Sequence, residues 1–396
     1  MSVRKRSWTT AKGEAKAAWV VDYVDATGKR RLKTFTKKKD ADAFAATATV
    51  EVREGVHVAD TASATVEAAS ALWLKSAERR VERGTLAQYR QHVKLHIVPL
   101  LGSTLLSRLT VPVVRQFEED LLDADRSPAM VRKVLVTLGS LIADAQERGL
   151  VVRNAVREKG RTRQKGRDRR LDRRQKGRLK LGVDIPTREE IKSLVGALEG
   201  RWRPILLTAI FTGLRASELR GLRWSDVDLD RGAIQVRQRA DYLNDIGSPK
   251  SEAGERTVPA PPIVINALRE WKLACPKGEA GLTFPNGAGK VESHANIVQR
   301  GLQPAMVAAG VTAEESLPDG KTLVVAKYPG LHALRHFYAS WCINRKEDGG
   351  LGLPPKSVQE RLGHSSIALT MDTYSHLFPA TDTADEMAAA ETALLG

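Results

Sequence analysis

The sequence predicts a multidomain protein: a small N-terminal three-stranded sheet plus a helix, an all-α bundle, and a large C-terminal domain that is mainly α (α+β). Three observations support this fold class. A length of 396 residues is enough for two or three separate cores. Period-two hydrophobic patterning near the start gives way to helical spacing. One short stretch is too basic to bury a core. We expect the domains at 1–60, 61–156 and 184–396, with a basic linker at 157–183.

The first domain has the pattern of a small sheet followed by a helix. Residues 19–25 are rich in strand-forming side chains, residues 26–29 have turn chemistry, and residues 31–35 alternate with period two. Thr36 can cap a helix from about Lys38 to Glu54. A basic β-ribbon suits a DNA groove or backbone, although a solvated basic face is equally consistent with the pattern. The candidate DNA-binding residues here are Lys29, Arg30, Arg31 and Lys33.

Residues from about 65 to 155 read as four short amphipathic helices in a compact bundle. Thr85 and Thr110 can cap the second and third helices, and Ser127 followed by proline can cap the fourth. The fourth helix is expected to stop at Gly149. The bundle by itself indicates no function.

Residues 157–180 form a basic stretch with 13 basic and 3 acidic residues in 24, a net charge of +10. With so few apolar side chains, it is expected to be a linker that is disordered, or helical only when bound. We interpret it as a strap along DNA phosphates, gaining affinity by counterion release, in preference to a solvated spacer. The candidate DNA-binding residues are Arg161, Arg163, Arg169, Arg170, Arg173 and Arg174.

The charge of the whole chain also favours nucleic acid. Lys and Arg number 63 against 47 Asp and Glu, a net charge of +16. Such a surplus favours a polyanionic partner, although a basic enzyme or a ribosome-associated protein is an alternative. Cys275 and Cys342 are too few for a disulfide framework and lack metal-ligand spacing. The sequence has no apolar run of membrane-spanning length and no signal peptide, so we expect a cytoplasmic protein with no membrane partner.

In the large domain, residues 187–190 predict a capping box, and residues 233–236 belong to a region of short strands. Four stretches could carry chemistry: TGLRASELRGLRW, SPKSEAGERTVP, GLHALRHFYAS and RLGHSSIALTMDTYSH. Taken singly, their polar residues could have purely structural roles. Arg215 and Glu218 are three apart and could be a simple helical ion pair, although Gly213 suggests a helix end that leaves the arginine at a turn.

The other three stretches are equally ordinary one at a time. His332 and Arg335 share a helix face, whereas His336 is expected to point to another face. Lys250 lies in a turn between strands, and Tyr374 could be a core tyrosine.

Together these residues suit phosphoryl transfer to a tyrosine oxygen. Two guanidiniums can clamp the non-bridging oxygens and stabilise a pentacoordinate phosphate. A tyrosine hydroxyl is a weak nucleophile that needs help in losing its proton. A histidine and a lysine can accept and donate protons, one near the nucleophile and one at the departing 5′ oxygen. The sequence offers no carboxylate cluster for catalytic magnesium, so we expect no metal and no cofactor.

The four stretches resemble those of the tyrosine recombinases, specifically the phage-type integrases, and the resemblance spans nearly the whole chain. It implies an arm-type DNA-binding domain in the N-terminal sheet, a core-binding domain in the bundle and a catalytic domain after them. It also implies that Tyr374 attacks the scissile phosphate to leave a 3′-phosphotyrosyl link. The implied catalytic residues are Arg215, Lys250, His332, Arg335 and His364, with Tyr374 as nucleophile and Glu218 in support.

By the same resemblance, Lys250 is the general acid at the 5′ oxygen, His332 assists proton transfer, and His364 hydrogen-bonds the phosphate. The implied function is integration, and with helper proteins excision, of a phage or other mobile element. The implied partners are double-stranded DNA attachment sites, a homotetramer on DNA, and DNA-bending and excision proteins at the bacterial nucleoid. The alternatives are a chromosome-dimer resolvase, a type IB topoisomerase, or an inactive DNA-binding regulator of the same fold.

Two further segments stand out near the end of the chain. Residues 312–327 resemble an insertion before the stretch that contains His332 and Arg335. The last 22 residues are acidic and alanine-rich, and predict a helix. Such a helix could pack on its own domain, but we favour docking on a neighbouring protomer.

Overall fold

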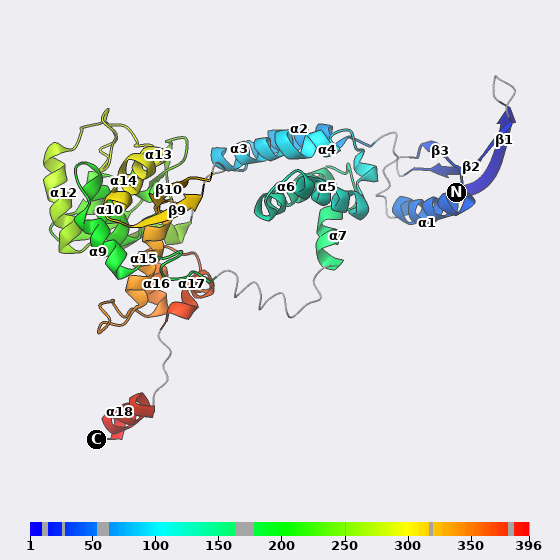
Figure 1. Ribbon diagram of the computed structural model, residues 1–396. Helices are drawn as coiled ribbons and strands as arrows, with labels where there is room; N and C mark the ends of the chain where they lie inside the picture. Colours follow the sequence, from blue (N-terminus) through cyan, green and yellow to red (C-terminus); the bar gives the residue numbers. More distant parts are fainter. Residues whose placement is uncertain are drawn as a thin grey trace. The chain divides into compact units, whose positions relative to one another are not determined.

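The computed structural model describes residues 1–9, 15–25, 28–53, 63–162, 178–249, 251–316, 320–378 and 384–395. The chain divides into two compact units, Met1–Gly166 and Arg167–Gly396. Figure 1 labels the helices and strands of each unit.

The first unit begins with an antiparallel sheet in the order β1-β2-β3, which confirms the predicted three-stranded sheet. The elements are β1 (Ser2–Thr9), β2 (Ala15–Val24), β3 (Arg30–Phe35) and helix α1 (Lys38–Arg53). Val21 and Tyr23 of β2 are buried against Ala41 and Phe44 of α1, so one face of the sheet forms a small core with the helix.

The rest of the first unit is helical, as predicted. Its elements are α2 (Val66–Ala77), α3 (Arg83–His92), the π-helical turn η2 (Val93–Ile97), α4 (Val98–Leu101), η3 (Leu106–Arg108), α5 (Val111–Asp123), α6 (Pro128–Glu147) and α7 (Ala155–Thr162). Ser127 caps α6 through its side chain, as expected, and Thr110 is the N-cap of α5 without a side-chain hydrogen bond. The prediction for Thr85 is wrong, because α3 starts at Arg83 and Glu82 is its N-cap.

Helix α7 includes the first residues of the predicted basic linker. Residues 157–162, assigned from the sequence to the linker, continue a helix that starts at Ala155, and Ala155 is buried in the core of the bundle. Lys159 is buried and forms an ion pair with Glu118 of α5. The charge count hid this helix because one buried lysine can pair with a single carboxylate on a neighbouring helix. The predicted residues 163, 169, 170, 173 and 174 lie outside the described ranges.

The second unit is mainly helical with small antiparallel sheets, as the sequence predicted. Its helices up to residue 308 are α9 (Arg188–Gly196), α10 (Trp202–Thr212), α11 (Ala216–Gly221), η4 (Trp224–Asp226), η5 (Glu252–Gly254), α12 (Pro262–Ala274), α13 (His294–Asn296), η6 (Ile297–Leu302) and α14 (Gln303–Ala308). The later ones are α15 (His332–Ile343), α16 (Pro355–Leu362), α17 (Ile367–Tyr374), η7 (Ser375–Leu377) and α18 (Ala384–Leu395). The strands are β4 (Val227–Asp228), β5 (Ala233–Val236), β6 (Arg239–Ala240), β7 (Ile246–Gly247), β8 (Arg256–Pro259), β9 (Thr312–Ser316) and β10 (Thr322–Ala326).

Helix α10 is the centre of this unit. Apolar side chains surround it almost completely, so it is buried between α12 and α15. Thr187 and Glu190 form the predicted capping box at the start of α9. Strands β4, β5 and β8 form one sheet, and the segment that resembled an insertion contains the antiparallel strands β9 and β10.

Gly213 ends α10 in the left-handed conformation, with φ of 61°, and turns the chain into α11. A Cβ at this position would lie 2.3 Å from the Tyr338 ring of α15. Both the backbone conformation and the close approach of α15 therefore require glycine here.

We predict that Gly213→Ala lowers the free energy of unfolding by about 3 kcal/mol, because it adds overpacking to a strained backbone. Gly200→Ala is the matched control. Gly200 also has a positive φ, of 55°, but its added Cβ would meet no atom within 4 Å. The control should therefore lose only about 1 kcal/mol in denaturant titrations. Equal losses in the two variants would contradict the proposed role of the Tyr338 contact.

Candidate functional site

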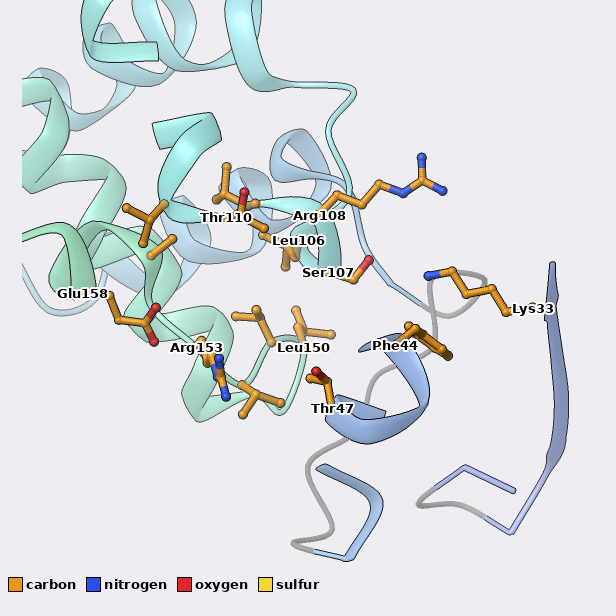
Figure 2. A pocket seen from close by; sticks show the side chains of 15 residues that line it. Lys33, Phe44, Thr47, Leu106, Ser107, Arg108, Thr110, Leu150, Arg153 and Glu158 are labelled. Atoms are coloured by element: carbon orange, nitrogen blue, oxygen red, sulfur yellow. The ribbon is translucent and has the colours of Figure 1, made fainter. Parts of the chain in front are cut away.

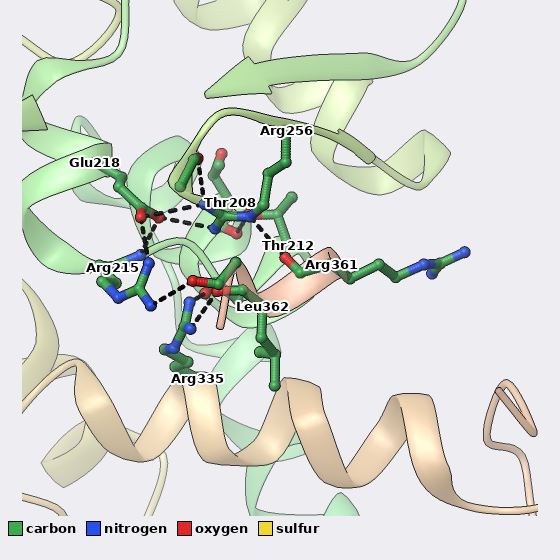
Figure 3. Close-up of polar contacts among 11 residues, drawn as sticks. Thr208, Thr212, Arg215, Glu218, Arg256, Arg335, Arg361 and Leu362 are labelled. Carbon is green, nitrogen blue, oxygen red and sulfur yellow. Dashed lines mark hydrogen bonds and ion pairs between the residues drawn. The ribbon is translucent and has the colours of Figure 1, made fainter. Parts of the chain in front are cut away.

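The end of helix α16 gathers three arginines. Gly363 ends this helix in the left-handed conformation, which turns its last carbonyls toward the arginines. Arg256 Nε donates to the Arg361 carbonyl at 2.8 Å, Arg335 Nη2 donates to the Leu362 carbonyl, and Arg215 Nη2 donates to the Gly363 carbonyl at 2.9 Å (Figure 3). These three successive carbonyls thus receive one guanidinium each.

Glu218 joins two of these arginines. Its carboxylate is buried, accepts Arg256 Nη2 at 2.8 Å and Arg215 Nη1 at 2.7 Å, and also accepts the backbone N–H of Arg215 (Figure 3). Burial raises the pKa of Glu218, but the hydrogen bond and charge of Arg256 and the charge of Arg215 outweigh it and bring the pKa to about 2. The predicted ion pair therefore exists, and it is part of a larger network.

Arg335 is the deepest of the three arginines, with 3% of its surface exposed. Its Nη1 donates to the Gly213 carbonyl at 2.5 Å, so it ties α15 to the ends of both α10 and α16. Burial and, to a lesser extent, the nearby charge of Arg215 lower the pKa of Arg335 to about 9, while the charge of Glu218 opposes the shift. A guanidinium has five N–H donors, so the two carbonyl bonds leave donors for an anion.

Tyr374 lies at the end of α17 and is 2% exposed. Its ring stacks on the His364 ring, with centroids 6.3 Å apart and planes at 3°. Burial raises the pKa of the Tyr374 hydroxyl to about 12, although the charges of Arg335 and Arg215 oppose this rise. The predicted nucleophile is therefore close to the predicted phosphate clamp, in its electrostatic field.

His364 and His332 flank this group. His364 is buried, and its Nδ1 forms a hydrogen bond with Thr370 Oγ1 at 2.9 Å. Burial and the charges of Arg335 and Arg215 lower the pKa of His364 to about 4. His332 is exposed at the start of α15, and partial desolvation of its ring, together with the same two charges, lowers its pKa as well.

The described part of the site therefore combines six of the predicted residues: Arg215, Glu218, His332, Arg335, His364 and Tyr374. Lys250 lies outside the described ranges. Arg215 and His332 reach the surface, whereas Arg335, His364 and Tyr374 lie beneath it.

Two residues of the site, Arg256 and His336, differ from what the sequence predicted. Arg256 stood in a quoted stretch, but its pairing with a carboxylate 38 positions earlier could not be read from spacing. The expectation that His336 points away from the other residues is wrong. Its ring packs edge-on against His332, with centroids 4.5 Å apart, and its Nδ1 is 2.8 Å from the Tyr374 hydroxyl. The spacing of four residues from His332 was the signal available.

The basic residues of the N-terminal sheet have partners within their own domain. Arg30 and Arg31 form ion pairs with Asp22 and Asp25, at 2.5 and 2.7 Å. Lys33 Nζ lies 4.3 Å from the centroid of the Phe44 ring. Arg30 and Lys29 are exposed, so they are the better placed of the four candidates to meet DNA.

A pocket of about 700 Å³ lies in the first unit. Its lining on the helical bundle includes Leu106, Thr110, Leu150 and Arg153 (Figure 2). Of the described candidate catalytic residues, none lines it.

The described ranges contain neither a candidate metal site nor a candidate membrane-spanning helix. No set of three or more His, Cys, Asp or Glu side chains there is placed to hold a metal ion. Likewise, none of the helices in those ranges is long and apolar enough to cross a bilayer.

Comparison with known proteins links both units to one family. Residues 186–381 match the Phage integrase family, and residues 65–122 match the Phage integrase, N-terminal SAM-like domain. A tyrosine recombinase XerC-like protein of Caldanaerobacter subterraneus subsp. tengcongensis is 29% identical over 227 residues, 51% of this chain and 52% of that protein. The chain thus spans about half the length of that relative.

Two other matches extend over more of the chain. The prophage integrase IntR of Escherichia coli (strain K12) is 22% identical over 325 residues, 76% of this chain and 74% of that protein. Among solved structures, a lambda integrase tetramer bound to a Holliday junction is 18% identical with a TM-score of 0.53, covering 91% of this chain and 95% of that one. The second likeness is one of fold.

We predict that Glu218→Gln lowers the free energy of unfolding by about 3 kcal/mol at pH 7, because two arginines lose their buried carboxylate. The pKa of Glu218 is below its ordinary value of 4.5. Its contribution to stability is therefore complete above that pH and is lost as the pH falls toward 2.

The difference between wild type and Glu218→Gln should accordingly shrink by about 2 kcal/mol between pH 5 and pH 3 in denaturant titrations. Glu279→Gln removes an exposed carboxylate of the same unit and is the control, with little expected change at any pH. A difference that stays constant with pH would show that Glu218 titrates normally in the folded protein.

Proposed function

The chain belongs to the phage integrase family of tyrosine recombinases, and from this premise we propose that it is a site-specific DNA recombinase, an integrase. It cleaves one DNA strand through Tyr374, forming a 3′-phosphotyrosyl intermediate, and rejoins it to a partner strand. The observation that carries the proposal is the placement of Tyr374 in the field of Arg335 and Arg215, which tune its pKa.

In this reaction the two arginines stabilise the charge that develops on the phosphate oxygens. Glu218 holds Arg215 in place, and His364, whose ring stacks on the Tyr374 ring, hydrogen-bonds the phosphate. Because Arg335 and Tyr374 are buried, the side chains that cover them must shift when DNA enters. Lys250 is the proposed acid at the 5′ oxygen, and the cleavage uses no cofactor.

The proposed partners are double-stranded attachment sites, bound by a homotetramer as in the lambda integrase complex with a Holliday junction. Helix α18 exposes Met387, Leu394 and Leu395, and such apolar exposure supports docking of this helix on a neighbouring protomer. DNA-bending and excision proteins would set the direction of the reaction. The site of action is the cytoplasmic nucleoid, where Lys29, Arg30 and the basic stretch would contact DNA.

A chromosome-dimer resolvase is the second candidate, because one relative is XerC-like. The β1–β3 sheet favours the integrase, since an arm-type domain would bind DNA outside the core site.

Recombination on substrates with and without flanking arm DNA separates the two candidates. An integrase should lose most of its activity when the arms are removed. Equal activity on the bare core site would favour the resolvase.

We predict that the wild type forms a covalent protein–DNA complex on a nicked suicide duplex carrying the core site, in the presence of EDTA. Tyr374→Phe should form less than about a thousandth as much, because it has no nucleophilic oxygen. The complex is measured on a denaturing gel, and binding of the same duplex is measured separately.

Tyr338→Phe is the matched control, since Tyr338 is another buried tyrosine of the same unit and should still form the complex. A complex that survives Tyr374→Phe would mean that another residue is the nucleophile. Tight binding without any complex from the wild type would favour the inactive DNA-binding regulator.

A further inference from the structure

Among the described residues, His336 lies within hydrogen-bonding distance of the Tyr374 hydroxyl. It lies one helical turn after His332 on α15, is half-buried, and places Nδ1 2.8 Å from the Tyr374 hydroxyl. The His336 and Tyr374 rings meet at 63° with centroids 5.8 Å apart. This geometry is within the range required for direct proton transfer between the two groups.

The Tyr374 hydroxyl needs a proton acceptor. Its pKa is raised to about 12 by burial, so almost none of it is ionised at neutral pH. The imidazole of His336 is available, because burial and the charges of His332 and Arg335 lower its pKa to about 4 and keep it neutral. A neutral imidazole with its hydrogen on Nε2 has a free lone pair on Nδ1.

We infer that His336 is a catalytic residue whose Nδ1 takes the proton of the Tyr374 hydroxyl as the tyrosine oxygen attacks the DNA phosphorus. This inference rests on the proposed function. In the step, the Tyr374 O–H bond breaks, an O–P bond forms, and the P–O bond to the 5′ oxygen breaks. The 5′ oxygen leaves with a proton from the general acid. In the reverse step, His336 returns its proton to Tyr374.

The surroundings of His336 change when DNA binds. Among the described residues, the charged and titratable groups around it are His332 and Arg335 on its own helix, Tyr374 on α17, and Asp184 before α9. A phosphodiester carries one negative charge, which offsets the arginines of the site. Binding therefore raises the affinity of the imidazole for a proton at the moment when the proton must be accepted.

His336 is better placed for this role than His332, the residue that the family resemblance suggests. The His332 ring contacts the His336 ring, whereas the His336 ring lies within hydrogen-bonding distance of the Tyr374 hydroxyl. His332 is exposed, His336 half-buried and Tyr374 buried, so the pair of imidazoles leads from the nucleophile toward the surface. A proton accepted by His336 consequently lies beside a second, exposed imidazole.

The test compares single-turnover rates of covalent complex formation by wild type, His336→Asn and His332→Asn between pH 5 and pH 9. The amide oxygen of asparagine can accept a hydrogen bond near the position of Nδ1, but it cannot take a proton. We expect His336→Asn to bind the suicide duplex normally and to react about 10²- to 10³-fold more slowly than wild type. The His332→Asn variant should lose less.

The pH profile separates a proton acceptor from a structural contact. The wild-type rate should level off above the pKa of the imidazole in the DNA complex, whereas the rate of His336→Asn should keep rising with pH as hydroxide replaces the base. The same rates are measured for His336→Gln, so that a folding defect of one variant does not decide the result.

Three outcomes would overturn the inference. A wild-type rate in His336→Asn would mean that His336 only orients the hydroxyl. A faster rate would mean that it holds Tyr374 back from the phosphate. A slow variant with an unchanged pH profile would mean a structural role. If the wild type itself forms no complex, the proposed function fails first, which distinguishes that result from the other three.

Discussion

The candidate site depends on one arrangement: three successive carbonyls at the end of α16, each bound by a different arginine. A helix C-terminus carries partial negative charge and leaves its last carbonyls without partners inside the helix, so cations there are favourable. Arg256 comes from β8, Arg215 from the start of α11 and Arg335 from α15. The α16 end therefore connects elements that are more than 100 residues apart in sequence.

Glu218 makes this concentration of positive charge tolerable. Three guanidiniums in a largely buried space repel one another, and burial adds a desolvation cost. The carboxylate offsets both effects for Arg215 and Arg256, while Arg335 relies on the carbonyls of Gly213 and Leu362. The network thus carries a surplus of positive charge beside the Tyr374 hydroxyl. Such a surplus suits an anionic substrate, and it opposes the rise that burial causes in the pKa of Tyr374.

Much of this could be predicted from the sequence, because local rules control it. The capping residues Thr187 and Ser127, and the glycine that ends α10, act within a few positions of themselves. The catalytic set was found by resemblance, and the structure brings most of its members together. Arg256 was missed because its partner Glu218 belongs to a distant element, and such pairing has no periodic signal.

Three expectations from the sequence differ from the structure. Thr85 was expected to cap a helix because it is a good capping residue, but α3 starts at Arg83, and its N-cap is Glu82, three positions before Thr85. His336 was judged by its immediate neighbour Arg335, whereas its face is shared with the residue four positions before it. Helix α7 was hidden by the charge of the stretch that contains it, since a single buried ion pair is enough to anchor Lys159.

The central claim is that this network serves a covalent step at Tyr374, and the position of the adduct tests it most directly. The trapped complex would be digested with nuclease and trypsin, and the nucleotide-bearing peptide identified by mass spectrometry. Trypsin releases residues 362–396 as one peptide, in which Tyr374 is the only tyrosine of the chain's six. A nucleotide on that peptide at Tyr374 is the predicted result. A nucleotide attached to any other residue would contradict the claim.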